Sequence, residues 1–219
     1  MQYEIWDICT LSKPIRLPIF LHWTIKHIYG NDKACVKLDD KLSKTFGVNQ
    51  GVRQGCVLSP LLFNIFMADL PKLLDNGGTV EIGHLKLSCL MWADDIVLLC
   101  ETEDGLRKSL DIVGKYCNEN KLTVNTDKTQ CMIFNKTGRL IRRKFLLNGR
   151  QLELVRSYKY LGFMFTPSGE ITTGLKDLKD RALKGFWKLK NSMGNEFIRN
   201  ISTTITLFDS LIKPIIICR

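Results

Sequence analysis

Two adjacent aspartates, Asp94 and Asp95, are the side chains in this sequence best suited to catalysis. The apolar runs LKLSCLMW before them and IVLLC after them predict two strands, which places the pair at the tip of a hairpin. Like charges at this spacing repel and apolar flanks desolvate them, so we expect a cation beside the pair. Magnesium prefers hard oxygen ligands, and a pair of such ions can stabilise both the attacking and the leaving oxygen in phosphoryl transfer. A pair of aspartates taken alone is more often a solvated turn.

Four sequence motifs in a fixed order favour a catalytic pair over a solvated turn. They are QGVRQGCVLSPLLFNIF (residues 50–66), WADDIVLL (92–99), LTVNTDKTQCMIF (122–134) and YLG (160–162). Together they resemble motifs B to E of the reverse transcriptases of non-LTR, or LINE-type, retrotransposons, and RQGCVLSPLLFN is especially typical of that branch. Trp92 is a departure that affects packing at the turn, because the family usually has Phe or Tyr before Ala-Asp-Asp.

The resemblance implies an RNA-directed DNA polymerase that transfers deoxynucleotides to the 3′ end of a DNA primer on an RNA template. It implies that Asp94 is a metal ligand, that Asp95 assists the metal and the primer terminus, and that an intact site holds a pair of Mg2+ or Mn2+ ions. It also implies that Lys128 donates a proton to the departing pyrophosphate, which an amine near phosphates can do. Lys128 is equally well explained as a solvated surface residue.

The resemblance also implies residues that bind nucleic acid. The loop and helix that position the template strand and the incoming nucleotide, where glycine permits close backbone approach, contain Gln54, Gly55, Ser59 and Asn64. The hairpin that holds the primer contains Tyr160 and Gly162, and a basic thumb helix that touches phosphates contains Lys179, Lys184 and Lys188. Simpler explanations stay open for two of them, since the Asn64 amide can bond to a neighbour in a buried helix and Tyr160 can pack on a sheet.

The hydrophobic patterns and the resemblance together imply an α+β fold followed by helices. We expect a two-layer α/β palm with a mostly antiparallel sheet, of the ferredoxin-like polymerase type and N-terminally truncated, over residues 1–170, and a helical thumb-like segment over residues 171–219. The predicted elements are a helix at 19–29, two strands joined around Asp39-Asp40, a helix capped by Ser59 and stopped by Pro71, a helix capped by Asp104, a strand at 130–134, a hairpin about Asn148-Gly149, and helices at 175–193 and 201–211.

The family's palm needs a further aspartate, in a strand before the Gln54 loop, to complete its metal site. The stretch from Pro18 to Gly51 matches the region between that strand and the loop, so we expect the missing motif just before Met1. Asp7, in EIWDIC, is the upstream aspartate with apolar neighbours, but it lacks the second aspartate that usually follows. We therefore expect these residues alone to be catalytically inactive. The alternatives are a non-catalytic nucleic-acid-binding remnant and, because a missing strand exposes its neighbours, a chain without a stable fold.

The charge of the chain is concentrated in its C-terminal half. The net charge is +10, but residues 1–120 carry 13 Lys and Arg against 15 Asp and Glu, whereas residues 121–219 carry 19 against 7. This asymmetry favours a phosphate-facing surface. The eight cysteines show no zinc-site spacing, and no apolar run approaches the length of about 18 residues that spans a bilayer. The sequence therefore predicts an intracellular protein, nuclear or cytoplasmic, without a membrane partner.

Overall fold

The computed structural model describes residues 19–30, 33–48, 52–53, 55–194 and 196–217, and the chain forms two compact units. The first unit comprises the residues up to Thr126 together with Leu146–Arg150, and the second comprises Asp127–Phe145 and the residues from Gln151 onward. Helices and small, mainly antiparallel sheets are mixed along the chain, which is an α+β composition. The ferredoxin-like arrangement of the palm and the boundary at residue 170 stay predictions.

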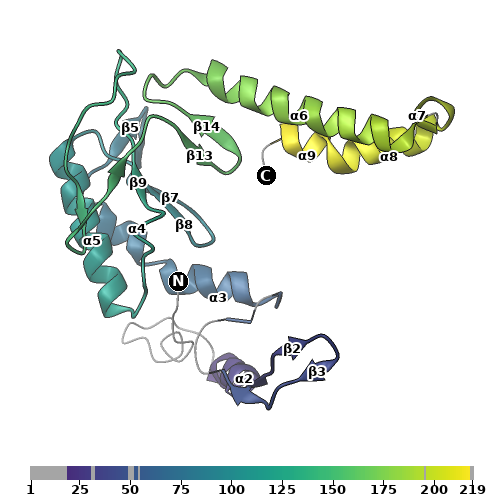
Figure 1. Ribbon diagram of the computed structural model, residues 1–219. Coiled ribbons are helices and arrows are strands. Elements are labelled where there is room, and N and C mark those ends of the chain that lie inside the picture. Colours follow the sequence, from purple (N-terminus) through teal and green to yellow (C-terminus); the bar gives the residue numbers. More distant parts are fainter. Residues whose placement is uncertain (1–18, 31–32, 49–51, 54, 195, 218–219) are drawn as a thin grey trace. The chain divides into compact units, whose positions relative to one another are not determined.

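The described residues of the first unit form four helices and most of the antiparallel hairpins (Figure 1). Its helices are α2 (Ile19–Tyr29), α3 (Ser59–Met67), α4 (Leu70–Leu74) and α5 (Glu103–Glu119), and its strands are β1 (Lys33–Ala34), β2 (Lys37–Leu38), β3 (Lys41–Leu42), β4 (Phe46–Gly47), β5 (Val80–Ile82), β6 (Leu85–Leu87), β7 (Cys89–Trp92), β8 (Asp95–Leu98) and β10 (Leu146–Leu147).

Helices α3 and α4 begin and end differently from the sequence prediction. Ser59 is not a cap, because the preceding Leu58 is already helical (φ −79°, ψ −24°) and makes no side-chain capping bond. Pro71 does not stop a helix either. It lies in the first turn of α4, where a missing N–H costs little. Helix α3 is buried on one side, where Leu62 and Phe66 lie, and Leu61 and Asn64 form an exposed stripe on the other.

The segment 33–48 forms a hairpin that is broken into two short ladders. β2 pairs with β3 across the turn at Asp39 and Asp40, and β1 pairs with β4. The predicted turn is therefore confirmed, but two continuous strands are not formed. Val36, Leu38, Leu42 and Phe46 are all exposed.

Strands β5 to β8 form two antiparallel hairpins, and α5 packs against α4. The run LKLSCLMW is therefore not one strand, because its first half pairs with β5 and its second half with β8. The cap of α5 is Thr102, whose Oγ1 accepts from Gly105 N at 3.0 Å, and not Asp104, which lies in the first turn. Burial raises the pKa of Tyr116 to about 12, and the Tyr116 hydroxyl donates to the carbonyl oxygen of Phe66 on α3 at 2.9 Å.

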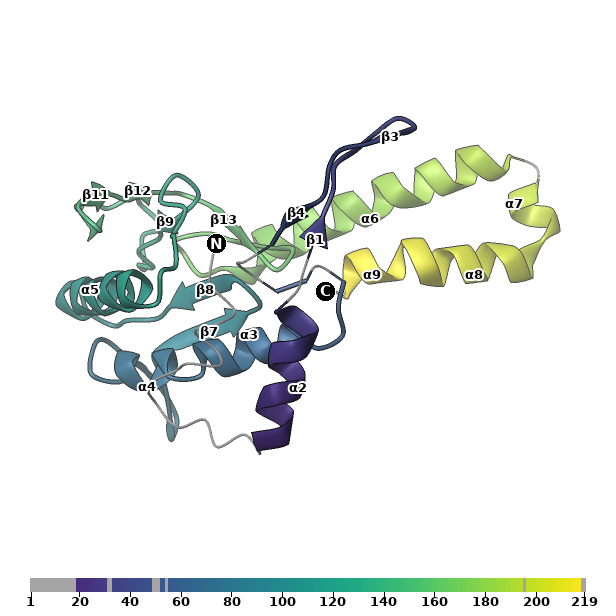
Figure 2. The ribbon, with the colours of Figure 1, turned by 90° about the horizontal axis from the view of Figure 1, so that it is seen from below.

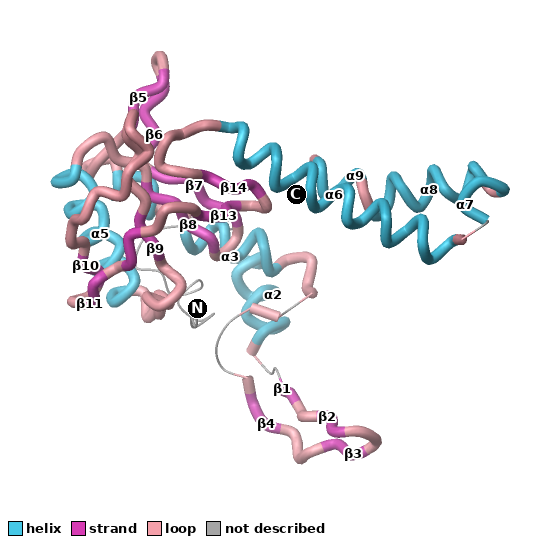
Figure 3. The backbone as a smooth tube through the Cα atoms, turned by 45° about the horizontal axis from the view of Figure 1, so that its top comes forward, coloured by secondary structure: helices cyan, strands magenta, loops and turns pink. Residues whose placement is uncertain are grey.

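The second unit combines short strands with a helical segment (Figure 1). Its strands are β9 (Gln130–Cys131), β12 (Glu153–Leu154), β13 (Tyr158–Tyr160) and β14 (Phe163–Phe165), its helices are α6 (Ile171–Met193), α7 (Glu196–Arg199), α8 (Ile201–Leu211) and α9 (Lys213–Ile216), and β11 (Arg150–Gln151) leads into it. β9 is shorter than the predicted strand at 130–134 and pairs with β12 in parallel, whereas β13 and β14 form an antiparallel hairpin. Figure 3 shows how short the strands are. The predicted turn at Asn148 and Gly149 is present, with φ of 50° and 76°.

Helices α8 and α9 pack along α6 (Figure 2). Ala182, Leu189 and Ile212 form the buried centre of this packing, with Phe197 and Phe208 partly buried around it. Leu178, Ala182 and Leu189 lie on the buried side of α6, whereas Leu175 near its start is exposed.

The start of α6 lies very close to β14. A β-carbon at Gly174 would overlap the Phe163 ring and lie 2.7 Å from the Met164 carbonyl oxygen. Only glycine fits there without movement of the helix or the hairpin. Among the described residues, no helix is long and apolar enough to cross a membrane.

Candidate active site and nucleic-acid interface

The two aspartates lie at the turn between β7 and β8, as the sequence predicts. Trp92 pairs with Asp95, which leaves Ala93 and Asp94 as the two turn residues, and Ala93 has a positive φ of 52°. A two-residue turn with a left-handed first position matches the twist of the flanking strands. Cross-strand pairing puts the side chains of Trp92 and Asp95 on the same face of the hairpin.

Both aspartates are exposed, and so is Trp92, with 62% of its surface accessible. The expectation that apolar flanks desolvate the carboxylates is therefore wrong for this structure. The reason is geometric, because the tight turn carries both residues past the buried parts of the strands. The exposed carboxylates can approach a phosphate-bearing ligand from solvent.

The donor chemistry of Asp94 and Asp95 fits a hard cation. Two neighbouring carboxylates can bind magnesium, which keeps several waters and takes its remaining ligands from substrate phosphates. Among the described residues, no group of three or more His, Cys, Asp or Glu side chains is placed to hold a metal ion. Asp7, the candidate for a further carboxylate, lies outside the described residues.

A hydrogen-bonded cluster organises the loop before α3. The Ser59 hydroxyl donates to the Arg53 carbonyl oxygen at 2.6 Å, and the Tyr29 hydroxyl lies 3.4 Å from both Ser59 Oγ and Cys56 Sγ. The Arg53 guanidinium lies 5.3 Å from the centre of the Tyr29 ring and donates to the Ile28 carbonyl oxygen. The end of α2 therefore fixes the loop that the sequence assigns to template binding.

The same cluster shifts the pKa values of two of its members. Burial raises the pKa of the Tyr29 phenol, and the hydrogen bond from Tyr29 lowers the pKa of the Cys56 thiol. A donor directed at sulfur stabilises the thiolate, which accounts for the direction of the Cys56 shift.

The predicted template residues are only partly described. Gly55 has a positive φ of 80° with open space around its α-carbon, and Ser59 is buried beneath the loop. Asn64 is exposed on α3, which disfavours the explanation that its amide forms a hydrogen bond to a neighbour inside a buried helix. Gln54 lies outside the described residues.

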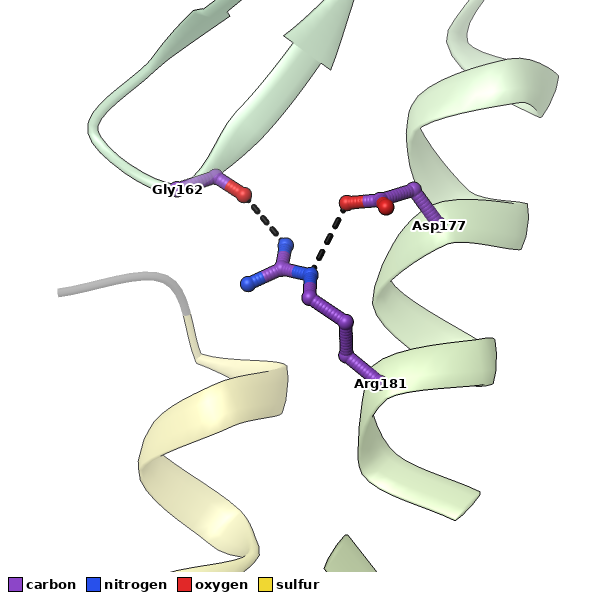
Figure 4. Close-up of polar contacts among 3 residues, drawn as sticks. All are labelled: Gly162, Asp177 and Arg181. Atoms are coloured by element: carbon purple, nitrogen blue, oxygen red, sulfur yellow. Dashed lines mark hydrogen bonds and ion pairs between the residues drawn. The ribbon is translucent and has the colours of Figure 1, made fainter. Parts of the chain in front are cut away.

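Residues predicted to act on the primer belong to the second unit. Tyr160 ends β13, and Leu161 and Gly162 form the turn to β14 with φ of 46° and 85°. Arg181 on α6 donates to the Gly162 carbonyl oxygen and, from Nε, to Asp177 Oδ2 at 2.9 Å (Figure 4). Helix α6 therefore holds the turn that contains YLG. Lys128 is exposed before β9, and its role stays a prediction.

The lysines of α6 are exposed, as expected for a surface that faces phosphates. Lys179, Lys184 and Lys188 all point away from the packed side of the helix, and Trp187 among them is 53% exposed. Lys190 Nζ lies 4.9 Å from the centre of the Trp187 ring. Lysines next to an accessible aromatic side chain suit the phosphates and the flat bases of a nucleic acid.

Sequence reasoning missed Tyr29, Arg53 and Arg181 as positioning residues. For Arg181 the signal was present, because Asp177 lies four residues earlier on a predicted helix. Tyr29 carried no comparable signal, since its partners lie 27 and 30 residues away in the sequence.

Comparison with known proteins places these features in one family. The family described as Reverse transcriptase (RNA-dependent DNA polymerase) matches residues 10–165. Over 166 residues the chain is 32% identical to the Retrovirus-related Pol polyprotein from type-1 retrotransposable element R2 of Nasonia vitripennis, covering 71% of the chain and 16% of that protein.

Two further relatives come from Drosophila melanogaster. The chain is 28% identical over 157 residues to the Retrovirus-related Pol polyprotein from type-2 retrotransposable element R2DM, covering 67% of the chain and 15% of that protein. It is 24% identical over 225 residues to the RNA-directed DNA polymerase from mobile element jockey, covering 96% of the chain and 23% of that protein. The chain therefore spans less than a quarter of the length of these relatives.

Proposed function

This chain belongs to the reverse transcriptase family, in its non-LTR retrotransposon branch, and from that premise we propose that it forms the part of an RNA-directed DNA polymerase that holds the catalytic aspartates and the primer. The observation that carries the proposal is the exposed Asp94-Asp95 pair at the tip of the β7–β8 hairpin. The substrates would be deoxynucleotides, a DNA primer and an RNA template.

Asp94 is the metal ligand in this proposal, and Asp95 assists it. Bound magnesium or manganese would stabilise charge on the attacking and leaving oxygens of nucleotidyl transfer. The hairpin contributes by presenting both carboxylates to solvent on a two-residue turn, where an incoming triphosphate can reach them.

The remaining site residues position nucleic acid. Ser59, fixed by Tyr29 and Arg53, sets the loop beside which the template and the nucleotide bind. The YLG turn holds the primer terminus, and Arg181 keeps that turn on α6. The α6 lysines contact backbone phosphates without reading sequence.

We expect the 219 residues on their own to bind a primer–template duplex without extending it. The candidate for the family's further aspartate in this sequence is Asp7, whose surroundings differ from the family pattern. Loss of one charge-stabilising group at a polymerase site can lower the rate on the order of 100-fold or more.

Primer extension tests this expectation. The purified chain is given an RNA template, a DNA primer, deoxynucleotides and magnesium, beside an Asp94→Ala/Asp95→Ala control. No extension with retained duplex binding supports the proposal as stated. Extension that the double change abolishes would confirm the role of the aspartates and overturn the expected inactivity, whereas extension that survives it would remove Asp94 and Asp95 from the site.

A second candidate is a non-catalytic nucleic-acid-binding module, which the exposed lysines of α6 favour. It predicts duplex binding that survives Asp94→Ala and falls when Lys179, Lys184 and Lys188 are changed to Gln. If the lysine changes leave duplex affinity unaltered, the assignment of α6 as the thumb is wrong.

A further inference from the structure

The loop between β9 and β10 is strongly basic and has no role in the function proposed above. We call residues 135–144 the basic loop. No Asp or Glu occurs from Lys128 to Leu152. All five cationic side chains of the basic loop are exposed: Lys136, Arg139, Arg142, Arg143 and Lys144.

The side chain of Asn135 gives the first half of the basic loop a defined shape. Its Oδ1 accepts from Thr137 N at 3.1 Å, from Thr137 Oγ1 at 2.6 Å and from Arg139 N at 3.3 Å. Its Nδ2 donates to the carbonyl oxygens of Arg139 at 2.9 Å and Ile133 at 3.3 Å. An asparagine that bonds to the following backbone is a common way to order a turn. Lys136 and Arg139 are therefore carried on an ordered turn.

The basic loop is fixed beside the segment that leads into α6. Asn135 N donates to the Pro167 carbonyl oxygen at 2.8 Å. Gly138, with a positive φ of 63°, lies against Ser168, because a β-carbon there would be 3.3 Å from Ser168 Cβ. The basic loop and the segment just before α6 are thus neighbours within the second unit.

Four of the five cations of the basic loop have no anionic partner among the described residues. Lys136, Arg139, Arg142 and Lys144 form no ion pair there within 4.0 Å. Like charges held this close destabilise the free protein, and a bound polyanion relieves their repulsion. Because the first half of the loop is already ordered, binding costs this half little conformational entropy.

We propose that the basic loop is a second phosphate-binding element, which holds the sugar–phosphate backbone of nucleic acid in addition to the lysines of α6. The proposal rests on the proposed function for its partner, a primer–template duplex. Arginine and lysine side chains without base-reading geometry predict binding that is independent of sequence and sensitive to salt.

The test measures affinity for a labelled DNA duplex and a labelled RNA–DNA hybrid over a series of salt concentrations. Arg139→Gln/Arg142→Gln is expected to lower affinity on the order of tenfold or more near 0.1 M salt. The slope of log K against log salt should fall by about 0.9 for each lost contact on duplex DNA. Thermal stability at low salt should not fall, because repulsion is removed, whereas a merely structural role would lower it.

Two further variants sharpen the test. Asn135→Ala keeps every cation but disorders the loop, so affinity should fall several-fold while the salt slope stays near the wild-type value. Lys108→Gln/Lys115→Gln removes the same charge from exposed positions of α5, beside Asp111 and Glu119, and should change affinity little.

The outcomes separate this inference from the proposed function. If the wild-type chain binds no duplex, both are overturned. If the α6 lysine changes weaken binding but the basic-loop changes act no more strongly than the α5 control, only the present inference is wrong. Binding to vesicles of anionic phospholipid that depends on the basic loop, with no dependence for duplexes, would show that the partner is a membrane surface.

Discussion

At the scale of single residues, the Tyr29 hydroxyl joins α2, which lies outside the four sequence motifs, to Cys56 and Ser59 in the motif at residues 50–66. It lies 3.4 Å from Cys56 Sγ and from Ser59 Oγ, and it is buried together with Ser59. The position of Asp94 and Asp95, the proposed catalytic residues, was predictable because local apolar runs define their hairpin. The residues that position the loop were not, because such contacts depend on tertiary packing.

Tyr29→Phe is expected to raise the pKa of the Cys56 thiol toward its ordinary value, because the hydrogen bond from Tyr29 is the largest cause that lowers it. Less thiolate is then present at neutral pH, so alkylation of Cys56 by iodoacetamide should slow and its pH profile should move to higher pH. Peptide mass spectrometry follows Cys56, with the exposed Cys35 as an internal reference. An unchanged Cys56 profile would contradict the assigned hydrogen bond.

At the scale of elements, long helices were predicted well and strands poorly. The helix at 19–29 has its predicted bounds, and α6 and α8 form where the sequence predicts helices. A 3.6-residue pattern over several turns is a strong signal for a helix. The strands are two to four residues long, so their pattern is too short to fix partners. The parallel pairing of β9 with β12 had no local signal at all.

Arg181→Ala should loosen the packing of the β13–β14 hairpin on α6. The pair with Asp177 is about two-thirds buried, and the same guanidinium bonds to the Gly162 carbonyl oxygen. Its loss should lower the local stability of the hairpin by about 1–3 kcal/mol, seen as faster amide hydrogen exchange in β13 and β14. Arg181→Lys, which cannot make both contacts with one planar group, should give an intermediate effect.

Lys213→Ala is the matched control for Arg181→Ala. It removes an ion pair with Asp209 at the same helical spacing, but both side chains are more than half exposed. Such pairs contribute about 0–1 kcal/mol, so exchange should change little. Equal effects of the two substitutions would show that Arg181 does not hold the hairpin.

At the scale of the whole molecule, charge divides the chain more clearly than hydrophobicity does. Residues 121–219 carry an excess of 12 positive charges, and residues 1–120 an excess of two negative charges. This division was readable from the sequence. The two compact units were not, because the second unit combines residues 127–145 with residues from 151 onward and so interrupts the order of the chain.

Photo-crosslinking to an RNA–DNA duplex should therefore modify mainly residues 121–219. Electrostatic attraction supplies most non-specific affinity for nucleic acid, and it weakens steeply as salt rises. Mass spectrometry of the crosslinked peptides at low salt and near 1 M salt checks both the location and the salt dependence. Crosslinks concentrated in residues 1–120, or unaffected by salt, would contradict an electrostatic interface in the C-terminal half.

The close approach of α6 to β14 at Gly174 also has a consequence for the gene. Every missense change of a glycine codon adds a β-carbon, which here meets the Phe163 ring and the Met164 carbonyl oxygen. Copies of a mobile element accumulate substitutions freely once their product is no longer selected. Among genomic copies of this element, a retained glycine codon at this position therefore marks lineages in which the hairpin and the helix must still pack, and makes the codon a gauge of purifying selection.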